Sequence, residues 1–251
     1  MARIDIENAS VSYYLRKRGG ASGLKGGSVG AQIIVGKRYL EIAALRNISL
    51  SLKDGDRVGL VGINGSGKST LLKLCAGAVA AQSGRVSVEG AVSPQFALGS
   101  GLRPELTGRQ NAELKCLYMR VPQSMVSRYV EEVKELSGLG GYFELPMQSY
   151  SAGMRSRLVM SLLRLVRGEI LIMDEWINVA DPSLNATVGG LQSKLIERSK
   201  ILILASHSRR VLDDWVNEIM WIDKGEIRDF GPIGDVYPKY QKWLTERNER
   251  K

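Results

Sequence analysis

The chain alternates between short apolar runs of strand length and longer segments with helical spacing. Residues 3–14 and 40–53 are typical of two paired strands, and the tetrad Lys-Asp-Gly-Asp at 53–56 indicates a turn. The other predicted strand-like segments are 57–61, 85–97, 169–175 and 200–206, with a terminal hairpin at 217–229. The predicted helices are 68–77, 109–120, 123–138, 152–166, 187–198 and 209–216.

This order of elements predicts an α/β fold in one domain that spans residues 1–251. Strands and helices alternate through a core, about 1–106 and 167–240, and the run of helices at about 107–166 is expected to form an inserted helical subdomain. Residues after Gly234 are expected to be too few for a further domain.

The net charge of +9 is concentrated in one segment. Residues 15–38 carry six cations, seven glycines and no acid, which is typical of a surface loop. The six cations are Arg16, Lys17, Arg18, Lys25, Lys37 and Arg38. Because the rest of the chain is close to balanced, we expect no nucleic-acid-coating surface.

Composition points to a protein of a reducing compartment. No stretch approaches the roughly 20 uninterrupted apolar residues that span a bilayer. The N-terminus is predicted to be a strand and not a signal peptide. Cys75 and Cys116 alone indicate no disulfide framework, so the cytoplasm is the simplest location.

The octapeptide from Gly62 to Ser69, GINGSGKS, matches the phosphate-loop (P-loop) pattern at every fixed position. It lies between an apolar strand and a helix, as its mechanism requires. Glycines let main-chain N–H groups wrap phosphates, Lys68 reaches the β- and γ-phosphates, and the Ser69 hydroxyl can bind Mg²⁺. A glycine-rich turn without function would explain this match, between a strand and a helix, much less well than a phosphate loop does.

The segment from Glu169 to Glu175 reads as a buried strand that ends in two carboxylates. Such an ending is common and is weak evidence alone. Beside the phosphate-loop strand, however, it would place Asp174 at a metal ion and Glu175 next to an attacking water.

Two further features carry little meaning alone. Ser151, in the run YSAGMRSRL, is predicted to be the N-cap of a basic helix. His207 is the single histidine of the chain, and a single histidine is more often a surface or core residue than a functional one. Both gain meaning from their position among the other motifs.

The runs GINGSGKST, YSAGMRSRL and ILIMDE, and the strand before Ser206-His207, resemble in order and spacing those of ATP-binding cassette (ABC) ATPases. The resemblance covers about residues 4–240. It is sharper with the ATPase subunits of polysaccharide exporters for O-antigen, capsule and teichoic acid, through PELTGRQN at 104–111, Leu145-Pro146 and the Asp181 segment. It implies a P-loop NTPase core of the ABC type, with an antiparallel β part and an inserted helical subdomain.

The resemblance also implies roles for individual residues. Ser151 and Gly153 look like the signature motif that caps the γ-phosphate of ATP on the other protomer. His207 looks like the switch histidine, and Asp181 like the loop aspartate that communicates across the dimer. Tyr13, or its neighbour Tyr14, resembles the aromatic residue that stacks on adenine. The nucleotide-binding residues implied in the phosphate loop are Gly62, Asn64, Gly65, Ser66, Gly67, Lys68, Ser69 and Thr70.

One departure concerns the glutamine that family members usually carry where the core meets the helical subdomain. Counting back from 107–111 places it at Leu98, while Gln95 lies three residues earlier. Either Gln95 serves as a metal ligand with Ser69 and Asp174, or Glu175 and His207 act without it.

These features predict a Mg-ATP-hydrolysing homodimer at the cytoplasmic face of the inner membrane. It would bind two copies of a separate ABC-2-type permease and energise export of a lipid-linked polysaccharide, with no nucleic-acid partner. An ATPase for a drug, lipid or imported solute is the nearer alternative. A nucleic-acid-associated cassette is the more distant one, since neither a coiled-coil insertion nor a second cassette is present.

Overall fold

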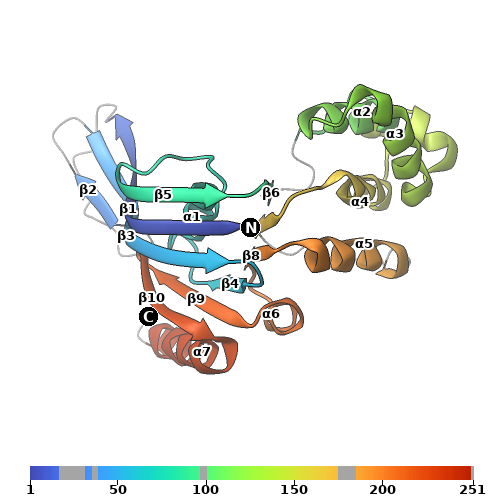
Figure 1. The fold of residues 1–251 in the computed structure, drawn as a ribbon. Coiled ribbons are helices and arrows are strands. Elements are labelled where there is room, and N and C mark those ends of the chain that lie inside the picture. The colour runs from blue at the N-terminus through green and yellow to red at the C-terminus, as the bar shows by residue number, and fades with distance from the viewer. Residues whose placement is uncertain (17–31, 36–38, 97–100, 175–184, 250–251) are drawn as a thin grey trace. The chain divides into compact units, whose positions relative to one another are not determined.

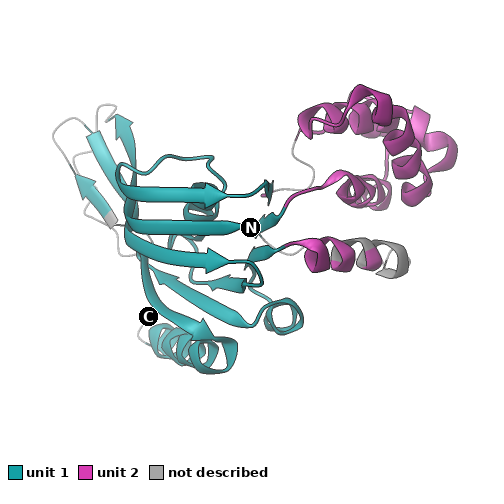
Figure 2. Ribbon diagram, viewed as in Figure 1, with its two compact units in different colours: residues 1–94, 169–176, 200–251 teal, residues 95–168, 177–199 magenta. Residues whose placement is uncertain are grey.

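The computed structural model describes residues 1–16, 32–35, 39–96, 101–174 and 185–249 (Figure 1). It divides into two compact units (Figure 2). Unit 1 comprises Met1–Pro94, Glu169–Trp176 and Lys200–Lys251, and unit 2 comprises Gln95–Gly168 and Ile177–Ser199.

Unit 1 contains a four-stranded antiparallel sheet with the order β2-β3-β1-β5. Its strands are β1 (Arg3–Arg16), β2 (Gln32–Val35), β3 (Tyr39–Lys53) and β5 (Ser83–Glu89). Alternate side chains of β1, such as Ile4 and Ile6, are buried, as expected for a sheet with one face in the core.

The prediction of a loop throughout 15–38 is wrong at 15–16 and at 32–35, which are strand residues. Leu15 and Arg16 extend β1, and the apolar, β-branched run at 32–35 pairs with β3 as β2. Residues 17–31 and 36–38 lie outside the described residues.

A six-stranded sheet of order β10-β9-β4-β8-β7-β6 forms the second layer. Its strands are β4 (Arg57–Val61), β6 (Val92–Gln95), β7 (Ile170–Asp174), β8 (Ile201–Ala205), β9 (Glu218–Asp223) and β10 (Glu226–Pro232). The pairs β4–β8, β4–β9 and β7–β8 are parallel, and β10 is antiparallel to β9. Every residue of β8 is buried, which explains its uninterrupted apolar sequence.

Among the described residues of unit 1, the helices are α1 (Lys68–Cys75), α6 (Arg209–Trp215) and α7 (Ile233–Glu249). The sequence did not predict α7, which contains Gly234 and Pro238, residues that disfavour helix interiors. Tertiary packing compensates, because Trp221 of β9 contacts Tyr240 and Trp243 of α7 at ring-centroid distances of 5.7 and 5.2 Å.

Unit 2 is helical. Its α-helices are α2 (Gly108–Tyr118), α3 (Gln123–Ser137), α4 (Ala152–Ser161) and α5 (Asn185–Arg198), and its 3₁₀ turns are η1 (Gly140–Glu144), η2 (Met147–Ser149) and η3 (Leu162–Leu165). A capping box joins Thr107 and Gln110 at the start of α2. The predicted helix at 152–166 is divided into α4 and η3.

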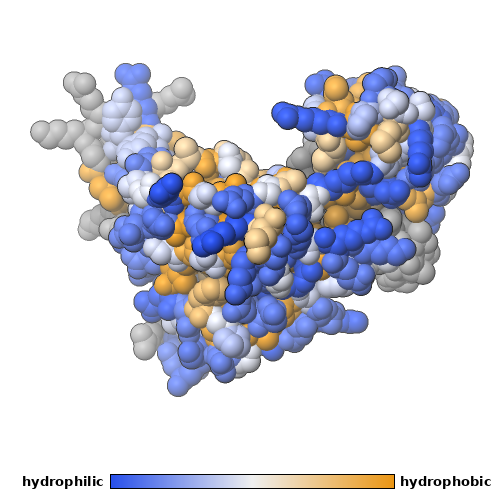
Figure 3. Space-filling view, viewed as in Figure 1, coloured by the Kyte–Doolittle hydropathy of each residue, from blue (hydrophilic) through white to orange (hydrophobic). Residues whose placement is uncertain are grey.

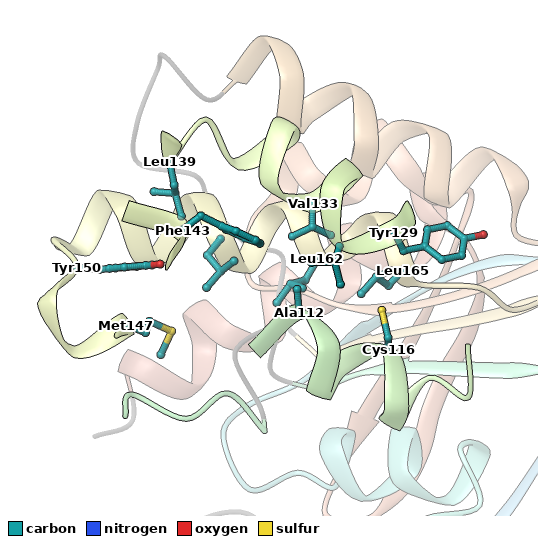
Figure 4. Packing of buried hydrophobic residues seen from close by; sticks show 12 residues of the cluster. Ala112, Cys116, Tyr129, Val133, Leu139, Phe143, Met147, Tyr150, Leu162 and Leu165 are labelled. Carbon is teal, nitrogen blue, oxygen red and sulfur yellow. The ribbon is translucent and has the colours of Figure 1, made fainter. Parts of the chain in front are cut away.

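One buried cluster holds unit 2 together and includes Phe143, Leu158 and Leu162, each at most 1% exposed (Figure 4). Segment Ile177–Ser199, which the sequence analysis placed in the core, groups with this unit instead. Hydrophilic residues cover most of the face shown in Figure 3, with apolar residues in smaller groups between them. Within the described part of the chain, none of the helices has both the length and the apolar character needed to cross a membrane.

Candidate functional site

The phosphate loop follows β4 and leads directly into α1. Gly67 forms the N-cap of α1 with φ 115°, a conformation that side chains with a Cβ rarely adopt. A Cβ at Gly67 would lie 2.6 Å from the main-chain oxygen of Ala44, so the close approach of β3 also requires glycine. The loop therefore presents its main chain, and not side chains, at the helix N-terminus.

Lys68 is the first residue of α1, and its side chain turns back over the loop. Its ammonium donates hydrogen bonds to the carbonyls of Gly62 (2.7 Å) and Ile63 (3.1 Å). No acid lies in the first turn of α1, so neither a neighbouring carboxylate nor a cap side chain there neutralises the positive helix end.

A cavity of about 390 Å³ lies over this loop, within the range of small-molecule sites. Its described lining residues are Tyr13, Ile42, Ala44, Asn64, Gly65, Gly67, Lys68, Ser69, Thr70, Asp174 and His207. The sequence-predicted residues of four separate segments thus meet at one cavity.

The strand register distinguishes the two candidate tyrosines. Tyr13 pairs with Ile42 and lines the cavity, whereas Tyr14 pairs with Glu41 on the opposite face of β1 and is 59% exposed. Ile42 and Ala44 were missed by sequence reasoning. Their only signal was the expected pairing of β1 with β3, whose register the sequence did not define.

The ends of parallel strands bring Asp174 and His207 to the same place. Asp174 is the last residue of β7 and pairs with Ala205, the last residue of β8, while Leu60 of β4 pairs with Ala205 from the other side. His207 follows two residues later. Because parallel strands end at a common edge, all three connections open into one cavity.

Gln95 is the last residue of β6, which neighbours β7 in the sheet. It is 6% exposed, and its Nε2 atom has no hydrogen-bond partner among the described residues. A buried, unpartnered amide is costly, so this side chain is suited to an additional polar ligand. The alternative position, Leu98, lies outside the described residues.

Two residues of the phosphate loop, Gly62 and Ser66, are not among the described residues that line the cavity. Ser66 is 1% exposed, and a Cβ at Gly62 would lie 2.6 Å from the Ser66 Oγ atom. The carbonyl of Ser66 accepts a hydrogen bond from the Gly225 N–H (2.8 Å), which ties the loop to the β9–β10 turn. Burial raises the pKa of the Tyr240 hydroxyl on α7, and the Gly62 N–H, which donates to it, acts in the opposite direction.

Ser151 and Gly153 belong to unit 2. The Ser151 hydroxyl caps α4 by accepting from the Met154 N–H (3.2 Å), and a Cβ at Gly153 would meet only the Ser151 Oγ, 3.9 Å away. Both residues therefore form an uncrowded helix N-terminus. The catalytic candidate Glu175 and the loop candidate Asp181 lie within 175–184, outside the described residues.

Comparisons with known proteins agree with this geometry. The family model described as ABC transporter matches residues 45–178. A solved ATP-binding cassette, MJ0796, in a dimeric post-hydrolysis state bound to ADP and phosphate, has a TM-score of 0.66 at 19% identity. The similarity covers 92% of this chain and 98% of that one. At 19% identity, this structural similarity shows a shared fold and nothing more.

Curated relatives are more similar in sequence. The teichoic acids export ATP-binding protein TagH of Lactococcus lactis subsp. lactis is 34% identical over 211 residues, which are 83% of this chain but 44% of the relative. TagH of Staphylococcus saprophyticus subsp. saprophyticus is 34% identical over 207 residues, covering 82% of this chain and 78% of the relative. The chain spans less than half of the first relative and most of the second. From its fold, its phosphate loop and these relatives, the chain belongs to the ABC transporter family as one of its ATP-binding cassettes.

Proposed function

We propose that this protein binds Mg-ATP in the cavity over the phosphate loop and hydrolyses it. The observation that carries the proposal is the convergence of the loop, Asp174 and His207 at one cavity. Main-chain N–H groups at the start of α1 and the Lys68 ammonium bind the phosphates, and Asn64 and Thr70 border them. Tyr13 stacks on adenine, with Ile42 and Ala44 as its apolar neighbours.

The residues also fit a magnesium ion. Ser69 and Asp174 supply oxygen ligands of the kind Mg²⁺ prefers, and Gln95 contributes its amide oxygen. The ion, when bound, neutralises charge on the β- and γ-phosphates. Glu175 accepts a proton from the attacking water, and His207 contacts the γ-phosphate and orients that water.

A single cassette supplies one phosphate loop and one signature helix. We propose a homodimer in which the α4 N-terminus of one protomer, with Ser151 and Gly153, caps the γ-phosphate bound to its partner. Asp181 communicates between the two sites. The dimeric post-hydrolysis state of the similar cassette MJ0796 supports this arrangement.

For the cargo, the names of the relatives favour a glycan. Because relatives that are 34% identical are named as teichoic acids export proteins, we propose that the chain energises export of a lipid-linked polysaccharide, of the teichoic acid, O-antigen or capsule class. It would act at the cytoplasmic face of the inner membrane with two copies of an ABC-2-type permease. If the cargo were instead a drug or a lipid, the ATP site would be the same, so the site alone does not identify the cargo.

Two substitutions test the ATP site directly. Lys68→Ala should raise the Kd for ATP roughly tenfold or more, because a charge-assisted contact to phosphate is lost. Asp174→Asn should keep most of the nucleotide affinity but lower turnover by on the order of a hundredfold. Binding is measured by calorimetry and turnover by phosphate release. Lys73→Ala, an exposed lysine of the same helix, is the matched control, and a Lys68→Ala protein that behaves like it would overturn the proposal.

The cargo is tested in the native host. With Lys68→Ala as the only copy, surface glycan should disappear while its lipid-linked precursor accumulates inside the cell. Normal surface glycan, with loss of another transported compound, would assign the ATPase to a different cargo.

A further inference from the structure

A second cavity, of about 630 Å³, lies within unit 2, where η3 ends and the last turns of α5 run beside it. Its described lining residues are Leu163, Arg164, Val166, Arg167, Gly168, Lys194, Leu195 and Arg198. None of them belongs to the phosphate-loop cavity, which is built from unit 1.

The lining carries four cations and, among the described residues, no acid. Only Arg164 has an ion pair, with Glu132 of α3 at 2.8 Å. In the described part of the chain, Arg167, Lys194 and Arg198 form none. The charges of these three side chains repel one another, and an anion in the cavity would relieve that repulsion.

Two of the guanidinium groups are held in place. Those of Arg164 and Arg167 lie 5.5 and 5.0 Å from the ring centroid of Tyr129. Tyr129 is 3% exposed and sits at one end of the buried cluster, next to Leu165 (Figure 4). Glu132 fixes Arg164 further. Ordering these side chains before a ligand arrives lowers the entropy lost on binding.

Helix electrostatics account for part of this arrangement only. Arg164 and Arg198 lie in the last turns of η3 and α5, where cations are favourable. Arg167 follows η3, and Lys194 precedes the last turn of α5. The helix ends therefore do not explain why all four cations surround one cavity.

We propose that this cavity binds a small molecule that carries two or more phosphate groups. Guanidinium forks match phosphate oxygens in pairs, and four cations suit more than one phosphate. Leu163, Val166 and Leu195 offer apolar surface to the rest of the ligand. The volume lies within the range of small-molecule sites. Inorganic polyphosphate and nucleotides share this chemistry, and the experiment separates them.

The test uses the full chain with Lys68→Ala, so that the phosphate loop no longer dominates binding. Tripolyphosphate and ADP are titrated separately by calorimetry, without Mg²⁺. Tripolyphosphate should bind at one site. Adding Arg167→Ser and Arg198→Ser in the same background should weaken that binding roughly tenfold or more, because two charge-assisted contacts are lost. Tighter binding of ADP than of tripolyphosphate would identify a nucleotide, and the reverse an inorganic polyphosphate.

The matched control adds Lys242→Ser and Arg210→Ser, which remove two exposed cations of unit 1. Equal weakening by both pairs would reduce the effect to net charge and overturn the proposal. So would the absence of binding, or binding of an acidic peptide in place of both phosphate compounds. If the Arg167/Arg198 variant does not fold, amide-exchange protection at 163–168 and 194–198 on adding ligand to the Lys68→Ala protein provides the answer, and unchanged exchange there refutes the site.

Discussion

At the scale of single residues, close main-chain approaches define the nucleotide cavity. Gly67 is the clearest case, because two independent constraints, its φ of 115° and the Ala44 oxygen, exclude a side chain. The conformation of the loop thus depends on β3, which lies about twenty residues earlier in the chain. The phosphate loop is a local motif in the sequence, but its conformation depends on a contact with a distant strand.

Gly67→Ala should therefore lower both stability and ATP affinity. We expect a loss of about 1–3 kcal/mol in unfolding free energy, from backbone strain and displacement of β3. Urea denaturation and ATP titration measure the two effects. Gly141→Ala, at a glycine with open space and no positive φ, is the control. Equal behaviour of the two variants would contradict the role given to the Ala44 contact.

At the scale of elements, Arg109 connects three parts of unit 2. From α2 it binds Glu144 of η1 through two parallel hydrogen bonds of 2.9 Å and Glu131 of α3 at 2.8 Å. These contacts lower the pKa of Glu144, chiefly through the Arg109 hydrogen bonds, against the desolvation that raises it. Since the folded pKa is depressed, the stabilisation is complete above the unfolded value of about 4.3 and is lost as the pH falls through the folded pKa.

Arg109→Lys should thus cost up to about 1 kcal/mol at pH 7, because lysine cannot form the paired hydrogen bonds and the groups are partly solvated. The difference from the unchanged protein should shrink as the pH is lowered from 5 to 3. Denaturant unfolding across this range measures it. Arg128→Lys, in which a 71%-exposed arginine pairs with Glu132 alone, should change little. A pH-independent deficit for Arg109→Lys would show that the loss is one of packing.

At the scale of the whole molecule, the proposed function requires two chains. The described residues that line the cavity over the phosphate loop belong to unit 1, and the α4 N-terminus belongs to unit 2. Ser151 remains an exposed helix cap. Each chain supplies one phosphate loop and one α4 N-terminus, so a symmetric pair of chains would form two complete sites.

Mixing two inactive variants tests this. Ser151→Arg should leave ATP binding by the monomer intact but abolish turnover, because a bulky cation enters the closed interface. A Lys68→Ala protein is inactive through its own loop. Heterodimers of the two carry both lesions in one site and an undamaged other site, so activity should reappear on mixing and reach a maximum near equal amounts. Activity that never exceeds that of the parents would argue against composite sites that work singly.

What the sequence determined by itself is local in the chain. The phosphate loop between strand and helix, the apolar strand ending at Asp174 and the cap at Ser151 are all short-range patterns, because turns, caps and buried strands depend on neighbouring residues. Helix α3 was predictable for the same reason, since its buried Tyr129, Val130 and Val133 recur at helical spacing. The roles of Glu175 and Asp181 stay predictions, because both residues lie outside the described part of the chain.

The tertiary structure decided whatever depends on register or on distant packing. Only the pairing of β1 with β3 separated Tyr13 from Tyr14 and brought Ile42 and Ala44 to the cavity, because a shift of one residue reverses the face of a strand. Helix α7 forms despite Gly234 and Pro238 because Trp221 covers its aromatic face. The basic cavity of unit 2 combines residues 163–168 and 194–198, which no sequence motif connects. Such sites arise from contacts between remote segments, and the free energy of those contacts cannot be inferred from the sequence of either segment alone.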